Sequence, residues 1–356
     1  MGHHTVHIVQ RLAPGGIESL VLGLLDAGDG DVSAISLEGS FDRLSADWPR
    51  LARYAGLASG LGKSPGLSPA LVFRLARELK HRRATAVVSH HIGPFLYGGL
   101  AARLTGMRHL VHVEHDAWHY QAPKRRLLGQ ALTRLLQPTL AAVSRPTTEA
   151  IREHLRRTPV EVRNGVDLSV FRPADSSELR NQLALPKSAK LVGSVGRLEE
   201  VKGHDILIEA ARQLGEEVHV VLAGSGSRMS ALQAMSAKLG LSDRVHFLGH
   251  RDDAAAVLQS LDVFCLPSRN EGLSLTLLEA QACGVSCVAT DVGASGEGLC
   301  PHSGNLVPSE DPEALAQAIQ RVLGASPATS PRAFIEQNFN WSDTVRRYAE
   351  LTGART

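Results

Sequence analysis

Short apolar runs alternate with helical patterns along the whole chain, and this alternation constrains the fold more than any other feature. Such an order is typical of parallel sheets covered by helices, rather than of a β-sandwich or a helical bundle. We therefore expect an α/β protein with two doubly wound, Rossmann-like domains in tandem. The predicted strands lie near residues 5–10, 32–36, 86–89, 109–114 and 139–143, and near 190–195, 218–223, 245–248, 263–267 and 286–290.

The length supports two domains, because 356 residues exceed what one hydrophobic core usually serves. The segment 168–187 has the proline and polar content of a linker. We expect an N-terminal domain over residues 1–167 and a C-terminal domain over 168–340. The Ala/Gly/Ser-rich segment 55–70 is expected to be a mobile loop.

Several protein classes do not fit this composition. No stretch of about 20 uninterrupted apolar residues occurs, and the N-terminus lacks a basic leader followed by an apolar segment, so we expect a cytoplasmic protein. The four cysteines have the spacing of neither a disulfide framework nor a zinc site, and we expect reduced core residues. They are Cys265, Cys283, Cys287 and Cys300.

Charge is unevenly distributed along the chain. Residues 1–172 carry 22 Lys and Arg against 14 Asp and Glu, and the remainder carries 16 against 22. With aromatic residues at only 4%, nucleic acid is not an expected partner. Clusters such as Lys80–Arg83 and Lys124–Arg126 instead indicate contact with an anionic membrane surface, although ordinary solvated helix faces would look the same.

The first motif with chemical content is Gly15-Gly16, which follows the first predicted strand and opens a helix over 19–25. Two glycines there let backbone amides approach an anion at a helix N-terminus, where the helix dipole is positive. A tight strand-to-helix turn explains the same residues. The three-glycine dinucleotide fingerprint is missing.

Two further motifs follow strands of the second half. Arg197 and Lys202 come directly after the strand at 190–195, and a guanidinium with an ammonium at a strand end suits a diphosphate, although salt bridges are an alternative. After the strand at 263–267, Glu271 precedes a loop with free amides, and Glu279 is expected about two turns into the next helix. An ordinary helix cap is the alternative.

The fourth motif is Glu114-His115-Asp116, at the end of a first-half strand. Its residue order differs from the zinc-protease helix motif, so we do not expect a metal site. A hydrogen-bonding His115 in the active site is the preferred interpretation, with a buried structural histidine as the alternative.

In order and spacing these motifs resemble those of the family 4 glycosyltransferases, over nearly the whole chain. The spacing from Glu271 to Glu279 matches the E-x7-E motif of that family, residues 162–173 resemble its interdomain crossing, and Ala223–Gly226 resemble its loop beside the nucleotide. The resemblance implies a GT-B fold, with two Rossmann-like domains facing a central cleft and residues 341–356 returning to the first domain as a helix.

The resemblance also implies roles for individual residues. Arg197 and Lys202 would hold the donor pyrophosphate and Glu279 the ribose, while Glu271 and His115 would act at the transferred sugar. The remaining implied donor contacts are Gly15, Gly16, Gly224, Gly226, Asn270, Gly272, Leu273, Ser274 and Leu275. No metal and no cofactor besides the nucleotide-sugar substrate is expected. Family members often have an aromatic residue where this chain has Leu273, which leaves the sugar open.

The function implied is that of a retaining hexosyltransferase of the EC 2.4 class. It would move a sugar from a GDP- or UDP-linked donor to a hydroxyl of a glycan or lipid-linked glycan, in bacterial polysaccharide or glycolipid biosynthesis. We expect it in the cytoplasm, as a peripheral protein at the inner face of the plasma membrane. A sugar-nucleotide epimerase or a phosphorylase of the same fold, and a non-catalytic nucleotide-sugar-binding regulator, are the alternatives.

Overall fold

The structure is a computed structural model that describes residues 2–116, 118–325 and 330–354. It divides the chain into two compact units. Unit 1 comprises Met1–Asn164 and Ser342–Thr356, and unit 2 comprises Gly165–Trp341. The chain first passes from one unit to the other after Asn164, three residues before the predicted boundary at 167.

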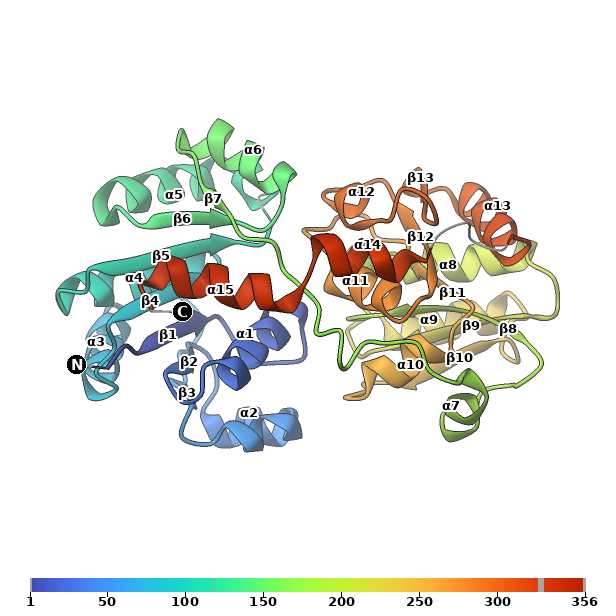
Figure 1. The fold of residues 1–356 in the computed structure, drawn as a ribbon, viewed down its shortest axis with the longest axis horizontal. Coiled ribbons are helices and arrows are strands. Elements are labelled where there is room, and N and C mark those ends of the chain that lie inside the picture. Colours follow the sequence, from blue (N-terminus) through green and yellow to red (C-terminus); the bar gives the residue numbers. More distant parts are fainter. Residues whose placement is uncertain (1, 117, 326–329, 355–356) are drawn as a thin grey trace. The chain divides into compact units, whose positions relative to one another are not determined.

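Unit 1 is built on a seven-stranded sheet with parallel neighbours, drawn with its helices in Figure 1. The strand order is β3-β2-β1-β4-β5-β6-β7, so the direction of winding reverses between β1 and β4. In such sheets ligands bind at the carboxyl ends of the strands at this reversal. The strands are β1 (Thr5–Val9), β2 (Val32–Ser36), β3 (Ala58–Gly60), β4 (Ala86–His90), β5 (His109–Glu114), β6 (Thr139–Ala142) and β7 (Val160–Glu161).

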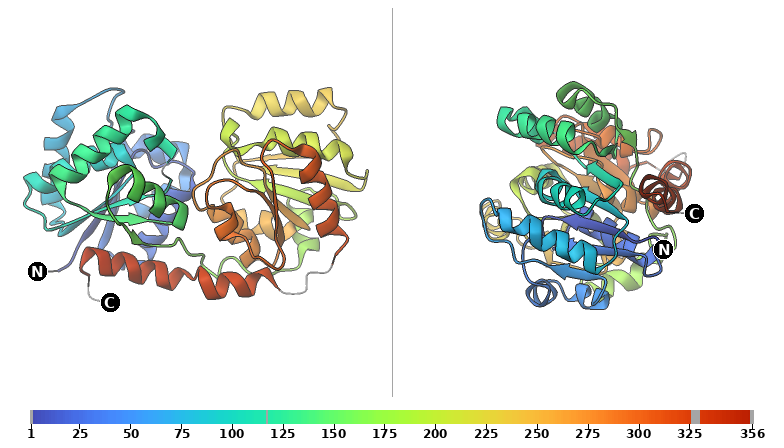
Figure 2. Two further views of the ribbon diagram at one scale, coloured as in Figure 1. Left: turned by 90° about the horizontal axis from the view of Figure 1, so that it is seen from above. Right: turned by 90° about the vertical axis from the view of Figure 1, so that its left-hand side faces the viewer.

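Helices cover both faces of this sheet (Figure 2). Apolar side chains of α3 and α4 pack with Ile8 and Val87 on one face, and α1 and α2 pack with Val9 and Ala34 on the other. The helices are α1 (Gly16–Ala27), α2 (Phe41–Asp47), α3 (Pro69–His81), α4 (Ile92–Leu104), α5 (Pro123–Leu136), α6 (Arg145–Leu155) and α15 (Trp341–Thr352), with 3₁₀ turns η1 (Pro49–Tyr54) and η2 (Trp118–Gln121).

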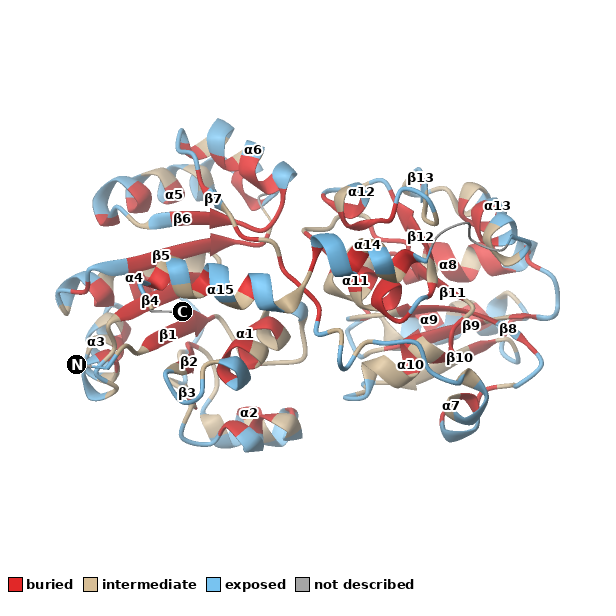
Figure 3. Ribbon diagram, viewed as in Figure 1, coloured by how far each residue is buried: buried red, intermediate tan, exposed pale blue. Residues whose placement is uncertain are grey.

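Unit 2 repeats this plan with a six-stranded sheet whose neighbours are again parallel. The order is β10-β9-β8-β11-β12-β13, and the reversal lies between β8 and β11. The four inner strands are buried along most of their length (Figure 3), as is typical of sheets covered on both faces, whereas the edge strands β10 and β13 are mostly half-buried or exposed. The six strands are β8 (Lys190–Val195), β9 (Val218–Ala223), β10 (Val245–Gly249), β11 (Val263–Leu266), β12 (Ser286–Thr290) and β13 (Asn305–Val307).

The unit 2 helices form two layers over the sheet. Residues of α8, α9 and α13 share one core cluster with the sheet, and residues of α10 and α11 share the other. Asp311 caps α13 by accepting a hydrogen bond from the amide of Ala314 at 2.9 Å. The helices are α7 (Ser176–Gln182), α8 (His204–Ala210), α9 (Met229–Lys238), α10 (Ala254–Ser260), α11 (Leu275–Ala282), α12 (Ser295–Gly298), α13 (Pro312–Leu323) and α14 (Pro331–Asn338), with 3₁₀ turns η3 (Glu200–Lys202) and η4 (Ala211–Gln213).

The two doubly wound sheets were predicted correctly, and the loop prediction for 55–70 holds only for residues 61–68. This segment contains strand β3, which pairs with β2, and it leads into α3. A Cβ on Gly60 would lie 2.3 Å from the carbonyl oxygen of Gly39. The small residue Gly60 therefore allows close packing of an edge strand.

The linker prediction for 168–187 was wrong as well, because α7 lies inside it. Buried Arg180 fixes this helix to unit 2: its Nη2 contacts Asp262 Oδ2 at 2.9 Å, and its Nε donates to the carbonyl of Ser260 at 2.9 Å. The short strands β7 and β13 were also not predicted.

The four cysteines are free and buried, as expected. Burial raises the pKa of the thiols of Cys265, Cys283 and Cys287. Among the described residues, no helix is both long and apolar enough to cross a membrane.

Candidate functional site

The carboxyl edge of the unit 2 sheet brings together the loops that follow β8, β9, β11 and β12. The loops after β8 and β9 are joined by backbone hydrogen bonds, such as that from the amide of Leu198 to the carbonyl of Ser225 at 2.9 Å. A Cβ on Gly224 would lie 1.8 Å from the carbonyl oxygen of Gly196, and one on Gly226 would lie 2.4 Å from that of Leu198. Both predicted glycines are therefore required for this close approach of two backbones.

Glu271 and Lys202 contact each other directly across the winding reversal. The Nζ of Lys202 lies 2.6 Å from Oε1 of Glu271, and the hydroxyl of Ser268 donates to the same oxygen at 2.7 Å. The Glu271 side chain is only 6% exposed and the Lys202 side chain 23%. Two residues predicted to contact different parts of a donor thus form one ion pair.

Two glycines bring the neighbouring backbone against this pair. Gly203, with φ 64°, follows Lys202, and a Cβ there would lie 2.0 Å from the carbonyl oxygen of Pro267. Gly293, with φ 55°, would place a Cβ 1.8 Å from the carbonyl oxygen of Glu271. Both the left-handed conformation and the lack of space exclude a side chain. Gly293 was not predicted, because nothing near it in the sequence indicates that it meets Glu271.

Arg269 fixes the loop after β11 from the other side. It forms a two-pronged ion pair with Asp205 of α8 at 2.9 and 2.7 Å, and it contacts the carboxylate of Glu310. Burial raises the pKa of Asp205, but hydrogen bonds and charge from Arg269 outweigh that effect, so this pKa lies below its ordinary value. Sequence reasoning gave Arg269 no role, although an arginine directly after a strand end was a usable signal.

Arg197 remains available for a ligand. It is exposed, and its guanidinium has no hydrogen bond or ion pair within the described parts of the chain. Nearby Glu199 accepts hydrogen bonds from the amide and hydroxyl of Ser227 at 3.0 and 2.5 Å, which lower its pKa. The acidic neighbour is thus held by the β9 loop, while the guanidinium is exposed to solvent.

The loop from Asn270 to Leu275 leads into α11. Asn270, Gly272 and Leu275 are partly exposed, whereas Leu273 is buried. The hydroxyl of Ser274 caps the helix by accepting from the amide of Leu277 at 3.4 Å. Because α11 begins at Leu275, Glu279 lies little more than one turn inside it, not the predicted two. Glu279 is partly exposed and has partners of its own.

In unit 1, Gly15 and Gly16 lie where predicted, between β1 and α1. Gly15 is the N-cap residue, and Gly16 is the exposed first residue of the helix. A Cβ on Gly15 would lie 2.4 Å from Oε2 of Glu18, so the Glu18 side chain folds back over the turn. The absence of a side chain on Gly15 therefore leaves room for this carboxylate, besides the role predicted for the residue.

His115 lies immediately after β5 and is buried. Its Nε2 is 2.8 Å from Nδ1 of His90, and burial lowers its pKa to about 3. His91, which precedes α4, has a φ of 71° and lies with its ring centroid 5.8 Å from that of His115. A non-glycine residue in this conformation costs about 1–3 kcal/mol and is common at functional sites.

Glu114 is a buried carboxylate beside His115. It is held by Nε2 of His112 at 2.9 Å and by the hydroxyl of Tyr120. Burial by itself raises its pKa, but these partners together lower it below the ordinary value. Across the described residues, no group of three or more His, Cys, Asp or Glu side chains could hold a metal ion.

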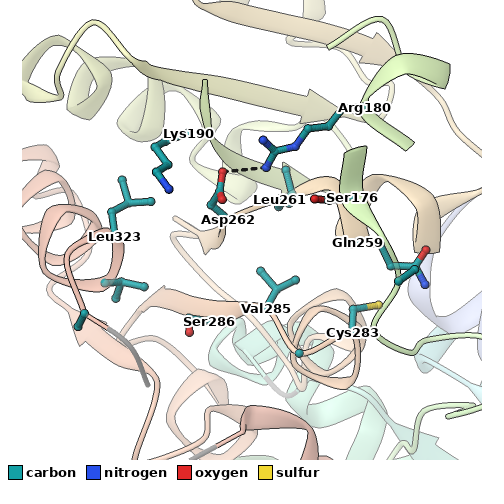
Figure 4. Close-up of a pocket in the computed structure, with 14 residues that line it drawn as sticks. Ser176, Arg180, Lys190, Gln259, Leu261, Asp262, Cys283, Val285, Ser286 and Leu323 are labelled. Atoms are coloured by element: carbon teal, nitrogen blue, oxygen red, sulfur yellow. Dashed lines mark hydrogen bonds and ion pairs between the residues drawn. The ribbon is translucent and has the colours of Figure 1, made fainter. Parts of the chain in front are cut away.

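A hollow of about 340 Å³ lies elsewhere in unit 2, at the amino ends of its strands (Figure 4). Lys190, Asp262 and Ser286 line it, together with the Arg180–Asp262 ion pair drawn in the figure. None of the predicted site residues lies in it. Because ligands of open α/β sheets bind at the carboxyl ends, we do not assign this hollow to the donor.

Two family models match this chain. The model described as Glycosyltransferase Family 4 matches residues 1–170, and the model described as Glycosyl transferases group 1 matches residues 175–341. The two matches together cover most of both units.

Curated relatives carry the name D-inositol 3-phosphate glycosyltransferase. The Mycolicibacterium gilvum protein is 40% identical over 205 residues, which are 54% of this chain and 45% of that protein. The Salinispora arenicola protein is 35% identical over 262 residues, 65% of this chain and 58% of that protein. The chain thus matches about half the length of these relatives.

Solved structures share the fold at lower identity. The Anabaena protein HepE, in complex with UDP and glucose, superposes with a TM-score of 0.85 at 20% identity, covering 99% of this chain and 100% of that chain. WaaG, a glycosyltransferase involved in lipopolysaccharide biosynthesis, superposes with a TM-score of 0.75 at 17% identity, covering 98% of this chain and 100% of that chain. These likenesses confirm the predicted GT-B fold.

Proposed function

The chain belongs to the family 4 glycosyltransferases, and on this premise we propose that it transfers a sugar from a nucleotide diphosphate sugar to a hydroxyl group. The donor site proposed is the carboxyl edge of the unit 2 sheet. Arg197 and Lys202 would bind the pyrophosphate, Glu279 the ribose and Glu271 the transferred sugar. The parts assigned to Gly15, Gly16 and His115 stay predictions that rest on the resemblance.

The observation that carries this proposal is the Lys202–Glu271 ion pair with the Ser268 hydrogen bond. The pair orients the carboxylate, and sugar hydroxyls can donate to its remaining lone pairs. Lys202 and exposed Arg197 both follow β8, and in the proposed site their positive charge would stabilise the negative charge that grows on the leaving diphosphate. Such preorganised charge is a large part of enzymatic rate enhancement.

We propose that transfer retains the anomeric configuration. The bond from the anomeric carbon to the diphosphate oxygen breaks, and the acceptor oxygen bonds to the same face of that carbon. The proton of the acceptor hydroxyl passes to the departing phosphate oxygen, so no metal and no covalent enzyme intermediate is needed. Trapping of a glycosylated Glu271 with a slow donor would contradict this step.

For the substrates, we propose a UDP-sugar as the first donor to test, since a solved structure with the same fold is a complex with UDP-glucose. GDP-sugars are the second choice. Two acceptor classes follow from different reasons: an inositol phosphate from the name of the relatives, and a lipid-linked glycan from the basic surface of unit 1.

Thermal-shift titration with UDP, GDP and their sugars tests the donor site, because a ligand of the native state raises stability by mass action. We expect a shift without added metal that is lost in Lys202→Ala. Lys238→Ala is the matched control, because it removes an exposed cation from α9 of the same unit. Mass spectrometry of the acceptor then distinguishes transfer from epimerisation. No shift with any nucleotide would overturn the proposal.

We also propose that α5 rests on an anionic membrane surface. Leu127 and Leu135 are 64% and 70% exposed on this helix, and Leu128 lies beside them at 38%. The helix contains no Asp or Glu but carries Lys124, Arg125, Arg126 and Arg134. Exposed leucines next to several cations fit the interface of an anionic bilayer, where each cation adds about 1 kcal/mol.

Liposome co-sedimentation tests this contact. We expect binding that requires anionic lipid and weakens in the double variant Leu127→Ser, Leu135→Ser. Leu67→Ser is the matched control, since Leu67 is 84% exposed but lies outside α5. Equal binding to neutral and anionic vesicles, or equal loss in the control, would contradict the proposal.

A further inference from the structure

Three buried histidines form a hydrogen-bonded line within unit 1, and we call His7, His90 and His115 the histidine ladder. Nδ1 of His7 lies 3.0 Å from Nε2 of His90, and Nδ1 of His90 lies 2.8 Å from Nε2 of His115. Successive ring centroids are 5.3 and 5.1 Å apart. The ladder thus crosses β1 and β4 and ends after β5, at the residue predicted to act at the sugar.

Strand register explains why the three rings meet. His7 pairs with Val88, two residues before His90, and His90 pairs with Val113, two residues before His115. Because side chains alternate between faces with a period of two, all three imidazoles lie on one face of the sheet. Each step along the ladder also moves toward the carboxyl edge. Neither β1 nor β4 by itself contains a motif that indicates this arrangement.

The surroundings keep the ladder uncharged at neutral pH. Burial is the largest cause that lowers the pKa of each of the three rings, to about 3 for His7 and His115. Charge from Asp116 raises the pKa of His115, but burial outweighs it, and His91 and His112 lower that pKa further. Tyr348 of α15 packs beside His7, and its hydroxyl has no hydrogen-bond partner among the described residues.

A line of neutral imidazoles has only two consistent proton arrangements, because each ring carries one proton and each hydrogen bond needs one. In the first, protons lie on Nδ1 of His7 and His90, so His115 accepts at Nε2 and carries its proton on Nδ1. In the second, His115 and His90 donate from Nε2, and His7 also carries its proton on Nε2. The tautomer of His115 is therefore coupled to a ring two steps away.

We propose that His7 and His90 are positioning residues that hold His115 in the tautomer protonated at Nε2, so that its Nδ1 accepts a hydrogen bond from a substrate hydroxyl. This role rests on the proposed function. The Nε2 tautomer is the intrinsically more stable form of a neutral histidine side chain, and the second arrangement gives it to all three rings. Nδ1 of His115 has no hydrogen-bond partner among the described residues, so this nitrogen is available to a ligand.

Nitrogen-15 NMR of the histidine rings in the full chain tests the ladder without any substrate. We expect a through-hydrogen-bond correlation between Nε2 of His115 and Nδ1 of His90, with the proton attached to Nε2 of His115. In His90→Phe the ladder is cut, and the two ring-nitrogen shifts of His115 should move toward each other. His90→Asn offers a carbonyl acceptor near the position of Nδ1 and should restore them. Tyr348→Phe, which removes only the unpaired hydroxyl, should leave them unchanged.

Activity provides the second measurement. For His90→Phe we expect kcat to fall at least about tenfold, with the donor Kd unchanged and partial rescue in His90→Asn. A proton on Nδ1 of His115 in the wild-type chain, or unchanged shifts in His90→Phe, would overturn the ladder proposal. If the ladder is found as described but no sugar is transferred, the proposed function fails and the ladder stands. If His90→Phe does not fold, the wild-type correlation alone decides.

Discussion

The two units place very different chemistry at the same position of the same topology. At the winding reversal of unit 2, the edge is built from ions: Lys202 pairs with Glu271, and Arg269 pairs with Asp205. At the corresponding edge of unit 1, His90 and His115 are buried and neutral. An ionic edge suits a diphosphate, and a neutral hydrogen-bonding edge suits hydroxyl groups. The fold sets where ligands meet the sheet, and the loop residues set which ligand fits.

Net charge gives no guide to this difference. The positive excess lies in residues 1–172, whereas the cations of the candidate donor edge lie in the acidic remainder. Long-range charge affects steering and surface association, but binding at close range depends on a few oriented groups. The predicted anionic partner of the basic half is accordingly a membrane surface at α5 and not the diphosphate.

The largest expected effect comes from removing the charge at the ionic edge. Glu271→Gln keeps the shape of the side chain but leaves Lys202 without its carboxylate, and the amide cannot accept sugar hydroxyls as strongly. We expect kcat/KM for sugar transfer to fall about 10²- to 10³-fold, the range for loss of one preorganised electrostatic group. Steady-state kinetics with the donor identified by thermal shift measure this.

Glu209→Gln is the control for that experiment, because Glu209 pairs with Arg212 on the surface of α8 in the same unit. It should change activity little. If Glu271→Gln were as active as the control, the ionic edge would have no part in the mechanism. The comparison between the two units would then have no functional meaning.

The neutral edge should make unit 1 the more acid-sensitive unit. The pKa of His7 is lowered to about 3, against 6.5 in an unfolded chain, so the unfolded chain binds more protons between these values. The stability that this group contributes is therefore complete above pH 6.5 and is lost as pH falls below it, by about 1.4 kcal/mol per pH unit. His115 adds a similar dependence. In unit 2, burial lowers the pKa of His204 to about 4, and it also lowers the pKa values of the less buried His219 and His246.

Native-state hydrogen exchange at pH 7 and pH 5.5 measures this, since the opening free energy of the slowest amides can be followed separately in each unit. We expect the opening free energy to decrease more between pH 7 and pH 5.5 in unit 1 than in unit 2. In His7→Phe this decrease in unit 1 should become smaller. Substitution of exposed His81 by Gln is the control and should not alter the slope. If the opening free energy changed equally with pH in both units, the ladder would not be a buried neutral network.

How much of this the sequence could predict depends on the range of the interactions. The long apolar strands were predictable from the local sequence pattern. Strand β3 was not, because its small residues allow a close contact between Gly60 and Gly39, which local composition cannot reveal. Helix α7 was misinterpreted for the same reason: its anchor, Arg180, binds Asp262, which lies 82 residues away in sequence.

The site shows the same division. Strand ends and residue types predicted Lys202, Glu271 and His115 as candidates, but not that Lys202 and Glu271 contact each other, since that contact depends on the order of β8 and β11 in the sheet. The histidine ladder depends on strand register, which no single segment specifies. A sequence lists the groups, and the sheet topology decides which of them meet.

A smaller effect is expected from crowding the ionic edge without changing its charge. Gly293→Ala must tolerate both φ 55° and a contact of 1.8 Å with the carbonyl of Glu271, so the loop has to move. Gly240→Ala is the matched control, with φ 70° but no atom within 4 Å of the added Cβ. We expect the control to lose about 1 kcal/mol of unfolding free energy and Gly293→Ala about 1–3 kcal/mol more, measured by urea unfolding. Equal losses would mean that Glu271 does not depend on this contact.

The smallest effect expected concerns the ionic scaffold rather than the site. Arg269→Met keeps the length of the side chain but removes the cation from Asp205 and Glu310, and leaves Asp205 partly buried without its partner. We expect a loss of about 1–2 kcal/mol of unfolding free energy, against less than about 0.5 kcal/mol for Arg251→Met, whose partner Asp253 is exposed.

The lowered pKa of Asp205 gives a further check. The stability that this group contributes is present above its ordinary pKa and is lost as pH falls through the pKa in the folded chain. In acid, Asp205 is protonated with or without Arg269. The loss of unfolding free energy in Arg269→Met beyond that in Arg251→Met should therefore become smaller as pH falls. A loss caused only by packing would not depend on pH.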